Sequence, residues 1–129
     1  MNIVADTNIF LAVALEEKNK ERIIEITTGC DIYAPEILPY EIGNALSAMV
    51  KRRQIPKDEV VTILNITQEI PVSLARVDLS KALRIAAQYK IYAYDAYFLQ
   101  CSLSLSSPLI TLDSDLKIVA KAMNIQILE

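Results

Sequence analysis

Residues 2–10 read NIVADTNIF, and this stretch decides the fold. Its first part, Asn2 to Ala5, is a short apolar run that predicts a strand. From Thr7 to about Glu17 the apolar residues recur at helical spacing, and Asp6 stands at the junction. A strand that passes directly into a helix is the first unit of an alternating α/β chain.

The remaining sequence continues this alternation. Further strands are expected at residues 31–34, 72–74, 109–112 and 125–128. Further helices are expected at 20–28, from between Pro35 and Pro39 to about Arg53, from Pro56 to the residue before Pro71, after Asp78 or Ser80, at 94–105 and at 114–123. Strands that alternate with helices imply crossover connections, so the expected fold class is α/β, with a mainly parallel sheet covered by helices on both faces.

Length and composition favour one ordered, soluble domain over residues 1–129. The chain has 129 residues, of which 53% are hydrophobic and 22% charged, which suffices for one core. Its longest apolar run, Ile9 to Leu15, has seven residues, whereas a membrane helix needs about 20. With no export signal visible, we expect a cytoplasmic protein that does not enter a membrane. Cys30 and Cys101 are far apart and are expected to be buried free thiols.

The absence of histidine and the scarcity of glycine exclude several kinds of site. No histidine is present, so imidazole bases, Ser-His-Asp triads and HExxH zinc sites are excluded. The only glycines, Gly29 and Gly43, cannot build a GxGxxG or GxxxxGK phosphate loop. A net charge of −3 argues against broad electrostatic capture of nucleic acid. Any catalysis must therefore depend on carboxylates, hydroxyls, lysine or a metal ion.

Four carboxylates are candidates, and each has an ordinary explanation. Asp6 and Asp113 each follow a predicted strand and precede a helix, where an aspartate commonly caps free backbone amides. Glu41, taken alone, is typical of a solvated helix surface. Asp95 lies among apolar residues, where a lone buried carboxylate is costly. In a parallel sheet, however, ligand sites form beyond the carboxyl ends of the strands, so Asp6, Asp95 and Asp113 can share one crevice and bind a divalent cation.

Together these motifs resemble the PIN-domain family, especially VapC-type toxins, over essentially the whole chain. They are Asp6-Thr7-Asn8 after the first strand, Glu41 in a helix with Asn44, Ala45 and Leu46, Tyr94-Asp95-Ala96 at a helix start, and residues 111–116, TLDSDL. The resemblance implies a three-layer α/β/α domain with a five-stranded sheet of order 3-2-1-4-5, which places Asp6 beside Asp113. It also implies a homodimer, and a small antitoxin that directs a basic side chain into the acidic crevice.

By the same resemblance, the acids hold Mg²⁺ or Mn²⁺ and hydrolyse single-stranded or loop RNA. Asp6, Asp95 and Asp113 are then the metal ligands, direct or through water. Glu41 holds a metal-bound water or acts as general base. Asn8 and Thr111 are candidates for orienting the carboxylates by hydrogen bonds, and Asp115 for an outer charge, although helix-start bonding and the helix dipole also explain them.

Two further groups have alternative interpretations. Lys51, Arg52 and Arg53 form the only basic run, which contacts the RNA backbone or simply complements a helix C-terminus. The cluster of Tyr89, Tyr92, Tyr94 and Tyr97 stacks on unpaired bases or, as we favour from the sequence, packs in the core or a dimer interface.

Three other functions compete with that of a nuclease. A non-catalytic PIN-fold module that binds RNA or protein is the main alternative to a nuclease. A response-regulator receiver is disfavoured because its paired acids and its lysine are missing. A haloacid-dehalogenase-type phosphatase is disfavoured because Asp6-Thr7-Asn8 lacks the second aspartate of a DxDxT loop.

Overall fold

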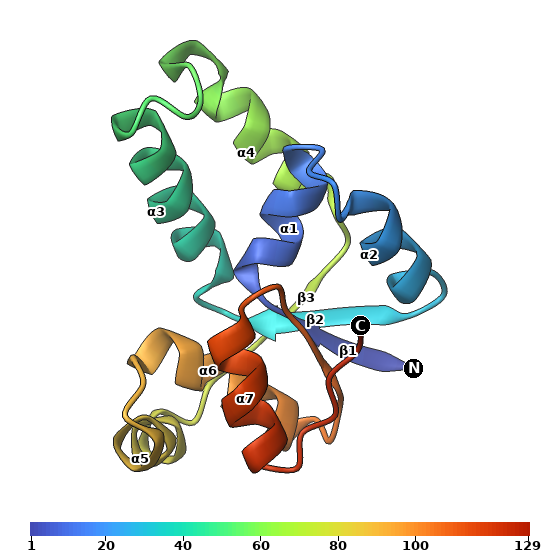
Figure 1. Ribbon diagram of the computed structural model, residues 1–129, viewed down its shortest axis with the longest axis vertical. Coiled ribbons are helices and arrows are strands. Elements are labelled where there is room, and N and C mark those ends of the chain that lie inside the picture. The colour runs from blue at the N-terminus through green and yellow to red at the C-terminus, as the bar shows by residue number, and fades with distance from the viewer.

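The computed structural model describes all of residues 1–129 and has three layers. A four-stranded parallel sheet of order β3-β2-β1-β4 forms the middle layer. Helices α1 to α4 lie on one side of it and α5 to α7 on the other (Figure 1). The strands are β1 (Asn2–Ala5), β2 (Asp31–Pro35), β3 (Ser73–Ala75) and β4 (Leu109–Ile110).

The expected alternation of strands and helices is confirmed. The helices are α1 (Thr7–Ala14), α2 (Lys20–Thr27), α3 (Leu38–Lys51), α4 (Val60–Glu69), α5 (Leu79–Tyr89), α6 (Ala93–Ser104) and α7 (Ser114–Ala122), with a short 3-10 turn η1 (Lys57–Glu59) before α4. Helix α1 ends earlier than its periodicity predicts, because Glu16 adopts a left-handed backbone with a φ of 54°. Gly29, at φ 78°, closes α2 as predicted, since glycine adopts this conformation without strain.

The sheet differs from expectation at its edge, where a fifth strand was predicted over residues 125–128. Only a single parallel bridge forms there, between Leu109 and Ile127. Strand β4 is itself just two residues long, because the backbone N–H groups beyond it bond to side chains. Leu112 N donates to Asn8 Oδ1 and Asp113 N donates to Thr111 Oγ1. These local bonds take the place of ladder bonds and end the strand.

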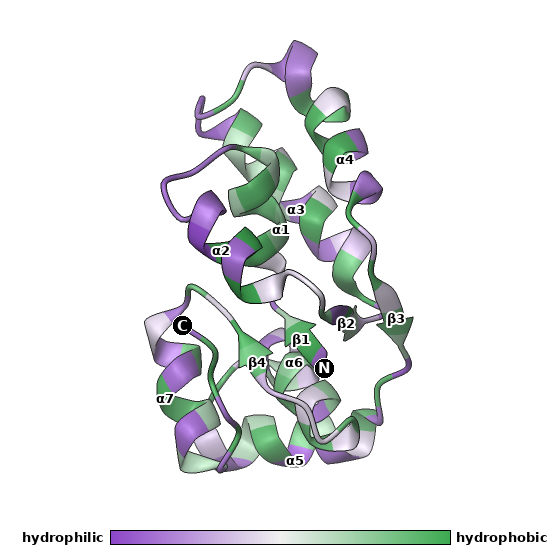
Figure 2. Cartoon of the chain, turned by 90° about the vertical axis from the view of Figure 1, so that its right-hand side faces the viewer, coloured by the Kyte–Doolittle hydropathy of each residue, from purple (hydrophilic) through white to green (hydrophobic).

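One hydrophobic core holds the layers together. Strand β1 is fully buried from Ile3 to Ala5, and Phe10 and Phe98 fill the space on the two sides of the sheet. Figure 2 shows β1, β4 and much of α1 as hydrophobic, whereas α2 alternates in the manner of a surface helix. Helix α6, which the sequence predicts to be apolar on nearly every side, packs against β1, β2 and β4 and is covered outside by α5. No helix combines the length and apolar character that a membrane crossing requires.

Both cysteines are free thiols, as predicted. Cys101 is buried in α6, and burial raises its pKa to about 11. The expectation of burial is wrong for Cys30, which is only half-buried because it lies in the turn between α2 and β2.

Candidate active site

Asp6 is the most deeply buried acid of the chain, with 7% of its surface exposed. It follows β1 and caps α1, with Oδ1 accepting a bond of 2.8 Å from Thr7 N. Its Oδ2 accepts bonds from Thr111 Oγ1 at 2.7 Å and from Asn8 Nδ2 at 3.1 Å. Burial raises the pKa of Asp6 to about 6 despite these bonds, and the charges of Glu41 and Asp95 act in the same direction.

Glu41 lies in the first turn of α3 and is held against α1. Its Oε2 accepts a hydrogen bond of 2.7 Å from Thr7 Oγ1, whereas Oε1 is buried and has no partner. Burial raises the pKa of Glu41, and the charge of Asp95 adds to the effect. The protein contains only one other buried side-chain atom without a partner, Ser102 Oγ. An unpaired buried carboxylate oxygen is costly, and this one indicates a place for a ligand or a water molecule.

Asp95 and Asp113 lie near Asp6 and Glu41 and complete the group of four acids. Asp95, in the first turn of α6, is half-buried rather than enclosed, because Tyr94 beside it is exposed to solvent. Burial raises its pKa, and the charge of Asp113 contributes as well. Like charges that shift one another's pKa lie within electrostatic range, so Asp6 after β1, Glu41 in α3, Asp95 in α6 and Asp113 before α7 are grouped at the carboxyl end of the sheet.

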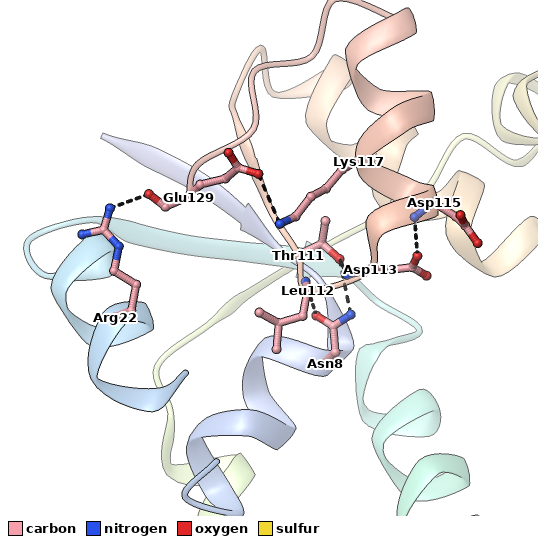
Figure 3. A network of polar contacts seen from close by, with 8 residues as sticks. All are labelled: Asn8, Arg22, Thr111, Leu112, Asp113, Asp115, Lys117 and Glu129. Atoms are coloured by element: carbon pink, nitrogen blue, oxygen red, sulfur yellow. Dashed lines mark hydrogen bonds and ion pairs between the residues drawn. The ribbon is translucent and has the colours of Figure 1, made fainter. Parts of the chain in front are cut away.

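Asp113 also caps a helix, as the sequence predicts. Its Oδ1 accepts a bond of 2.9 Å from Asp115 N (Figure 3). It also accepts a bond of 3.2 Å from Leu116 N, and the two bonds satisfy free amides at the start of α7. The side chain of Asp115 is exposed and forms no hydrogen bond or ion pair, so Asp115 takes part in the network only through its backbone N–H.

Asn8 and Thr111 join the two helix starts. Asn8 Nδ2 donates to Thr111 Oγ1 at 3.3 Å, and Asn8 Oδ1 accepts from Leu112 N at 3.1 Å (Figure 3). Asn8 Nδ2 also donates to Asp6. Thr111 Oγ1 in turn donates a hydrogen bond to Asp6 and accepts one of 3.0 Å from Asp113 N. A single buried hydroxyl therefore fixes the carboxylate of Asp6 and the backbone that carries Asp113.

A cleft of about 440 Å³ opens between α3 and α6 beside these acids. Glu41 and Asp95 lie in its wall. The remaining lining residues are Thr7, Ile37, Tyr40, Asn44, Ala45, Tyr92 and Tyr94. An acidic, partly aromatic cleft at the carboxyl ends of the strands is where an α/β protein holds its ligand.

A family model described as "PIN domain" matches residues 3–122. The chain belongs to the PIN domain family. This membership confirms the resemblance inferred from the motifs, and PIN domains are generally nucleases. No curated protein matches the sequence significantly.

Solved structures share the fold of this PIN domain at low sequence identity. PAE2754 from Pyrobaculum aerophilum is 20% identical, with a TM-score of 0.74 over 98% of this chain and 83% of the other. VapBC2 from Rickettsia felis, solved bound to a DNA fragment from their promoter, is 14% identical, with a TM-score of 0.68 over 99% and 98%. FitAcB from Neisseria gonorrhoeae is 18% identical, with a TM-score of 0.59 over 98% and 96%.

The donor chemistry of the PIN domain site fits a hard divalent cation, although its side chains are not closed around one. All candidate donors are carboxylate oxygens, and Glu41 Oε1 is buried without a partner. As the side chains lie, no three acidic groups are close enough together to hold a metal ion. Holding a cation there would require these carboxylates to move closer together.

Of the four clustered tyrosines, Tyr89 and Tyr97 are half-buried and pack against the core, as favoured from the sequence, whereas Tyr92 and Tyr94 do not. Tyr92 and Tyr94 are 84% and 57% exposed and line the cleft, so packing in the core is wrong for both. Tyr40 and Asn44 had no assigned role, yet both line the same cleft. Asn44 could have been found from its spacing, since a residue three positions after Glu41 lies on the same helix face, whereas Tyr40 directly precedes Glu41 and gave no such signal.

The basic run lies away from the acids. Lys51, Arg52 and Arg53 are exposed at the far end of α3, ten positions or more from Glu41, which is about 15 Å along a helix. No lysine or arginine lines the cleft. If these residues contact a bound substrate, they therefore contact a part of it that lies far from the acids.

Proposed function

We propose that this PIN domain is a divalent-metal-dependent endoribonuclease that hydrolyses phosphodiester bonds in single-stranded or loop RNA. The observation that carries the proposal is the buried, unpaired Oε1 of Glu41, beside a cleft that also holds Asp95. A carboxylate oxygen kept free of protein partners is available to a substrate, a water molecule or a cation. The proposed functional unit is the single domain of residues 1–129, acting in the cytoplasm.

Asp6, Asp95 and Asp113 are the proposed ligands of Mg²⁺ or Mn²⁺. When bound, the cation supplies positive charge that polarises the scissile phosphate and stabilises the departing ribose 3′ oxygen. Asp6 is rigidly oriented by Thr111 and Asn8, and Asp113 by the start of α7. Asp95 has no such bond and is the acid with the greatest freedom to move toward a cation.

Glu41 is proposed as the general base. Thr7 fixes its Oε2, which leaves Oε1 to accept a proton from the attacking water. The water oxygen then bonds to phosphorus as the bond to the 3′ oxygen breaks, and the 3′ oxygen takes a proton from solvent, giving a 5′ phosphate and a 3′ hydroxyl. The raised pKa of Glu41 favours this role, since a base is most effective when its pKa approaches the working pH.

The test is metal-dependent RNA cleavage by the purified protein. Cleavage is expected with Mg²⁺ or Mn²⁺, none with excess EDTA, and none in Asp6→Asn or Asp95→Asn. Asp31→Asn is the matched control, because Asp31 is an exposed acid at the opposite end of β2 and is expected to leave cleavage unchanged. Activity that survives EDTA or both site substitutions rules the proposal out.

A non-catalytic binding module is the second candidate, favoured by the absence of three grouped acids in the structure. In that case the fold docks RNA or protein without using its acids. Calorimetry with Mn²⁺ separates the two, because the nuclease requires saturable binding that Asp95→Asn weakens. Absence of Mn²⁺ binding in the folded wild-type protein favours the module.

We further propose that the protein is the toxin of a toxin–antitoxin pair and a homodimer. The similar fold of the VapBC2 and FitAcB structures supports the toxin assignment. The cleft wall carries two carboxylates and no lysine or arginine, so a basic side chain from a small antitoxin would complement its charge. A partner gene adjacent to this one and a dimeric mass by light scattering are the expected findings.

A further inference from the structure

The exposed aromatic residues of this protein are gathered in one place. Tyr40, Tyr92 and Tyr94 are 76%, 84% and 57% exposed, and all three line the cleft beside Glu41 and Asp95. Every other aromatic side chain is buried or half-buried. Large aromatic rings left in water at a concave site are typical of a binding surface.

The rings approach the cleft from both of its walls. Tyr40 comes from α3, directly before Glu41, while Tyr92 and Tyr94 both precede Asp95 at the start of α6. Tyr94 is held by an edge-on contact with Tyr97, at 5.8 Å between ring centroids and 82° between planes. Tyr92 makes no such contact, so its ring is free to pack against a ligand.

The charge of the cleft selects the kind of ligand these rings can bind. Its wall holds two carboxylates and no lysine or arginine, so a phosphate group gains nothing from the side chains there. A nucleobase is uncharged and stacks on tyrosine through its flat face. Asn44 adds an amide, which both donates and accepts hydrogen bonds at a base edge.

We propose that this cleft binds one unpaired nucleobase next to the scissile phosphate, with Tyr92 and Tyr40 stacking on it and Asn44 contacting its edge. The inference rests on the proposed nuclease function and deepens it, because it names the residues that select the substrate. A paired base has both faces covered in a duplex, so the same contacts exclude double-stranded RNA. The volume of about 440 Å³ lies in the usual range for sites that hold small planar ligands.

The test measures RNA binding separately from cleavage, in an Asp6→Asn background that is expected not to cut. The probe is a fluorescein-labelled single-stranded RNA decamer, followed by anisotropy at fixed salt, beside the same strand annealed to its complement. Tyr92→Ala is expected to weaken single-strand binding roughly 5- to 150-fold and to leave duplex binding unchanged. Tyr92→Phe keeps the ring and is expected to bind like the parent protein. Ile118→Ala, which removes an apolar side chain that is 67% exposed on α7, is the control.

A second measurement distinguishes stacking from a structural effect. A single abasic nucleotide is placed at each position of the decamer in turn. At the stacked position it weakens binding by the parent protein, and Tyr92→Ala then causes no further loss. Equal losses in Tyr92→Ala on intact, abasic and duplex RNA would overturn the inference.

The results also separate this inference from the proposed function. If wild-type protein cleaves RNA but Tyr92→Ala binds the single strand normally, stacking is wrong and the nuclease stands. If no RNA is cleaved while Tyr92-dependent single-strand binding persists, the nuclease is wrong and the base site stands. If Tyr92→Ala weakens only the binding of a protein partner, the cleft is a protein-docking site and this inference is overturned.

Discussion

Asp6 is a carboxylate that the fold buries while surrounding it with other acids. Its hydrogen bonds from Thr7, Asn8 and Thr111 stabilise the charged form, yet the pKa still rises to about 6 because desolvation outweighs them. Glu41 and Asp95 also have raised pKa values, mainly from burial. The folded protein therefore holds protons at this site more tightly than the unfolded chain does.

This difference predicts that stability falls as the pH rises. A group with a raised folded pKa stabilises the protein when protonated, and the gain disappears as the pH rises through the folded value. For Asp6, whose pKa rises from an ordinary value of 3.8 to about 6 in the folded protein, the loss between about pH 4.5 and 7.5 is roughly 2 kcal/mol. Urea unfolding in EDTA across this range measures it. Asp6→Asn should flatten the slope, and an unchanged slope in that variant would contradict the assignment.

At the scale of elements, three helices begin with an aspartate that caps them. Asp6 caps α1, Asp78 caps α5 and Asp113 caps α7. Asp78 is exposed, and its pKa is lowered mainly by its bond from Lys81 N. The capping geometry alone therefore does not distinguish Asp113 from Asp78, and only its position beside Asp95 does.

A matched pair of substitutions separates capping from function. Asp78→Ala and Asp113→Ala should each lower the free energy of unfolding by about 0.5–2 kcal/mol, because each removes an N-cap. Asparagine caps nearly as well, so Asp78→Asn and Asp113→Asn should both remain stable. Only Asp113→Asn should then slow RNA cleavage, by roughly 10- to 100-fold or more. Equal cleavage by the two asparagine variants would show that Asp113 is a cap alone.

The whole molecule brings the acids together from distant parts of the chain. Thr111 reaches Asp6 across 105 positions because β4 pairs with β1, and Thr7 reaches Glu41 across 34 because α3 packs against α1. Such a site does not exist in the unfolded chain. A cation that binds it must therefore stabilise the folded state.

Mg²⁺ or Mn²⁺ is accordingly expected to raise the melting temperature at about pH 7.5. Saturation at one hundred times the Kd contributes about 2.7 kcal/mol, a rise on the order of 10 °C for a domain of this size. Thermal melting followed by circular dichroism measures it, with NaCl added to equal ionic strength as the salt control. Asp31→Asn should show the full rise and Asp95→Asn little of it. The same rise in both variants would indicate nonspecific binding.

Most of the fold could be predicted from the sequence because its signals are local. The apolar run before Asp6, the helical spacing after it and the glycine at position 29 each act within a few residues. The fifth strand was predicted from the same kind of signal, and in the structure it is reduced to the single bridge between Leu109 and Ile127. Its formation depends on a neighbouring strand, and side-chain bonds from Asn8 and Thr111 end that strand early.

The sequence by itself determined the alternation of strands and helices, the family, and the candidate acids at the strand ends. Only the tertiary structure decided which atoms meet: that Thr111 holds Asp6, that Glu41 keeps one buried oxygen free, and that Tyr92 lies in a cleft. The physical reason is the separation along the chain over which each signal acts. Periodicity and capping depend on neighbours within a helical turn, whereas burial and exposure depend on which distant elements pack together.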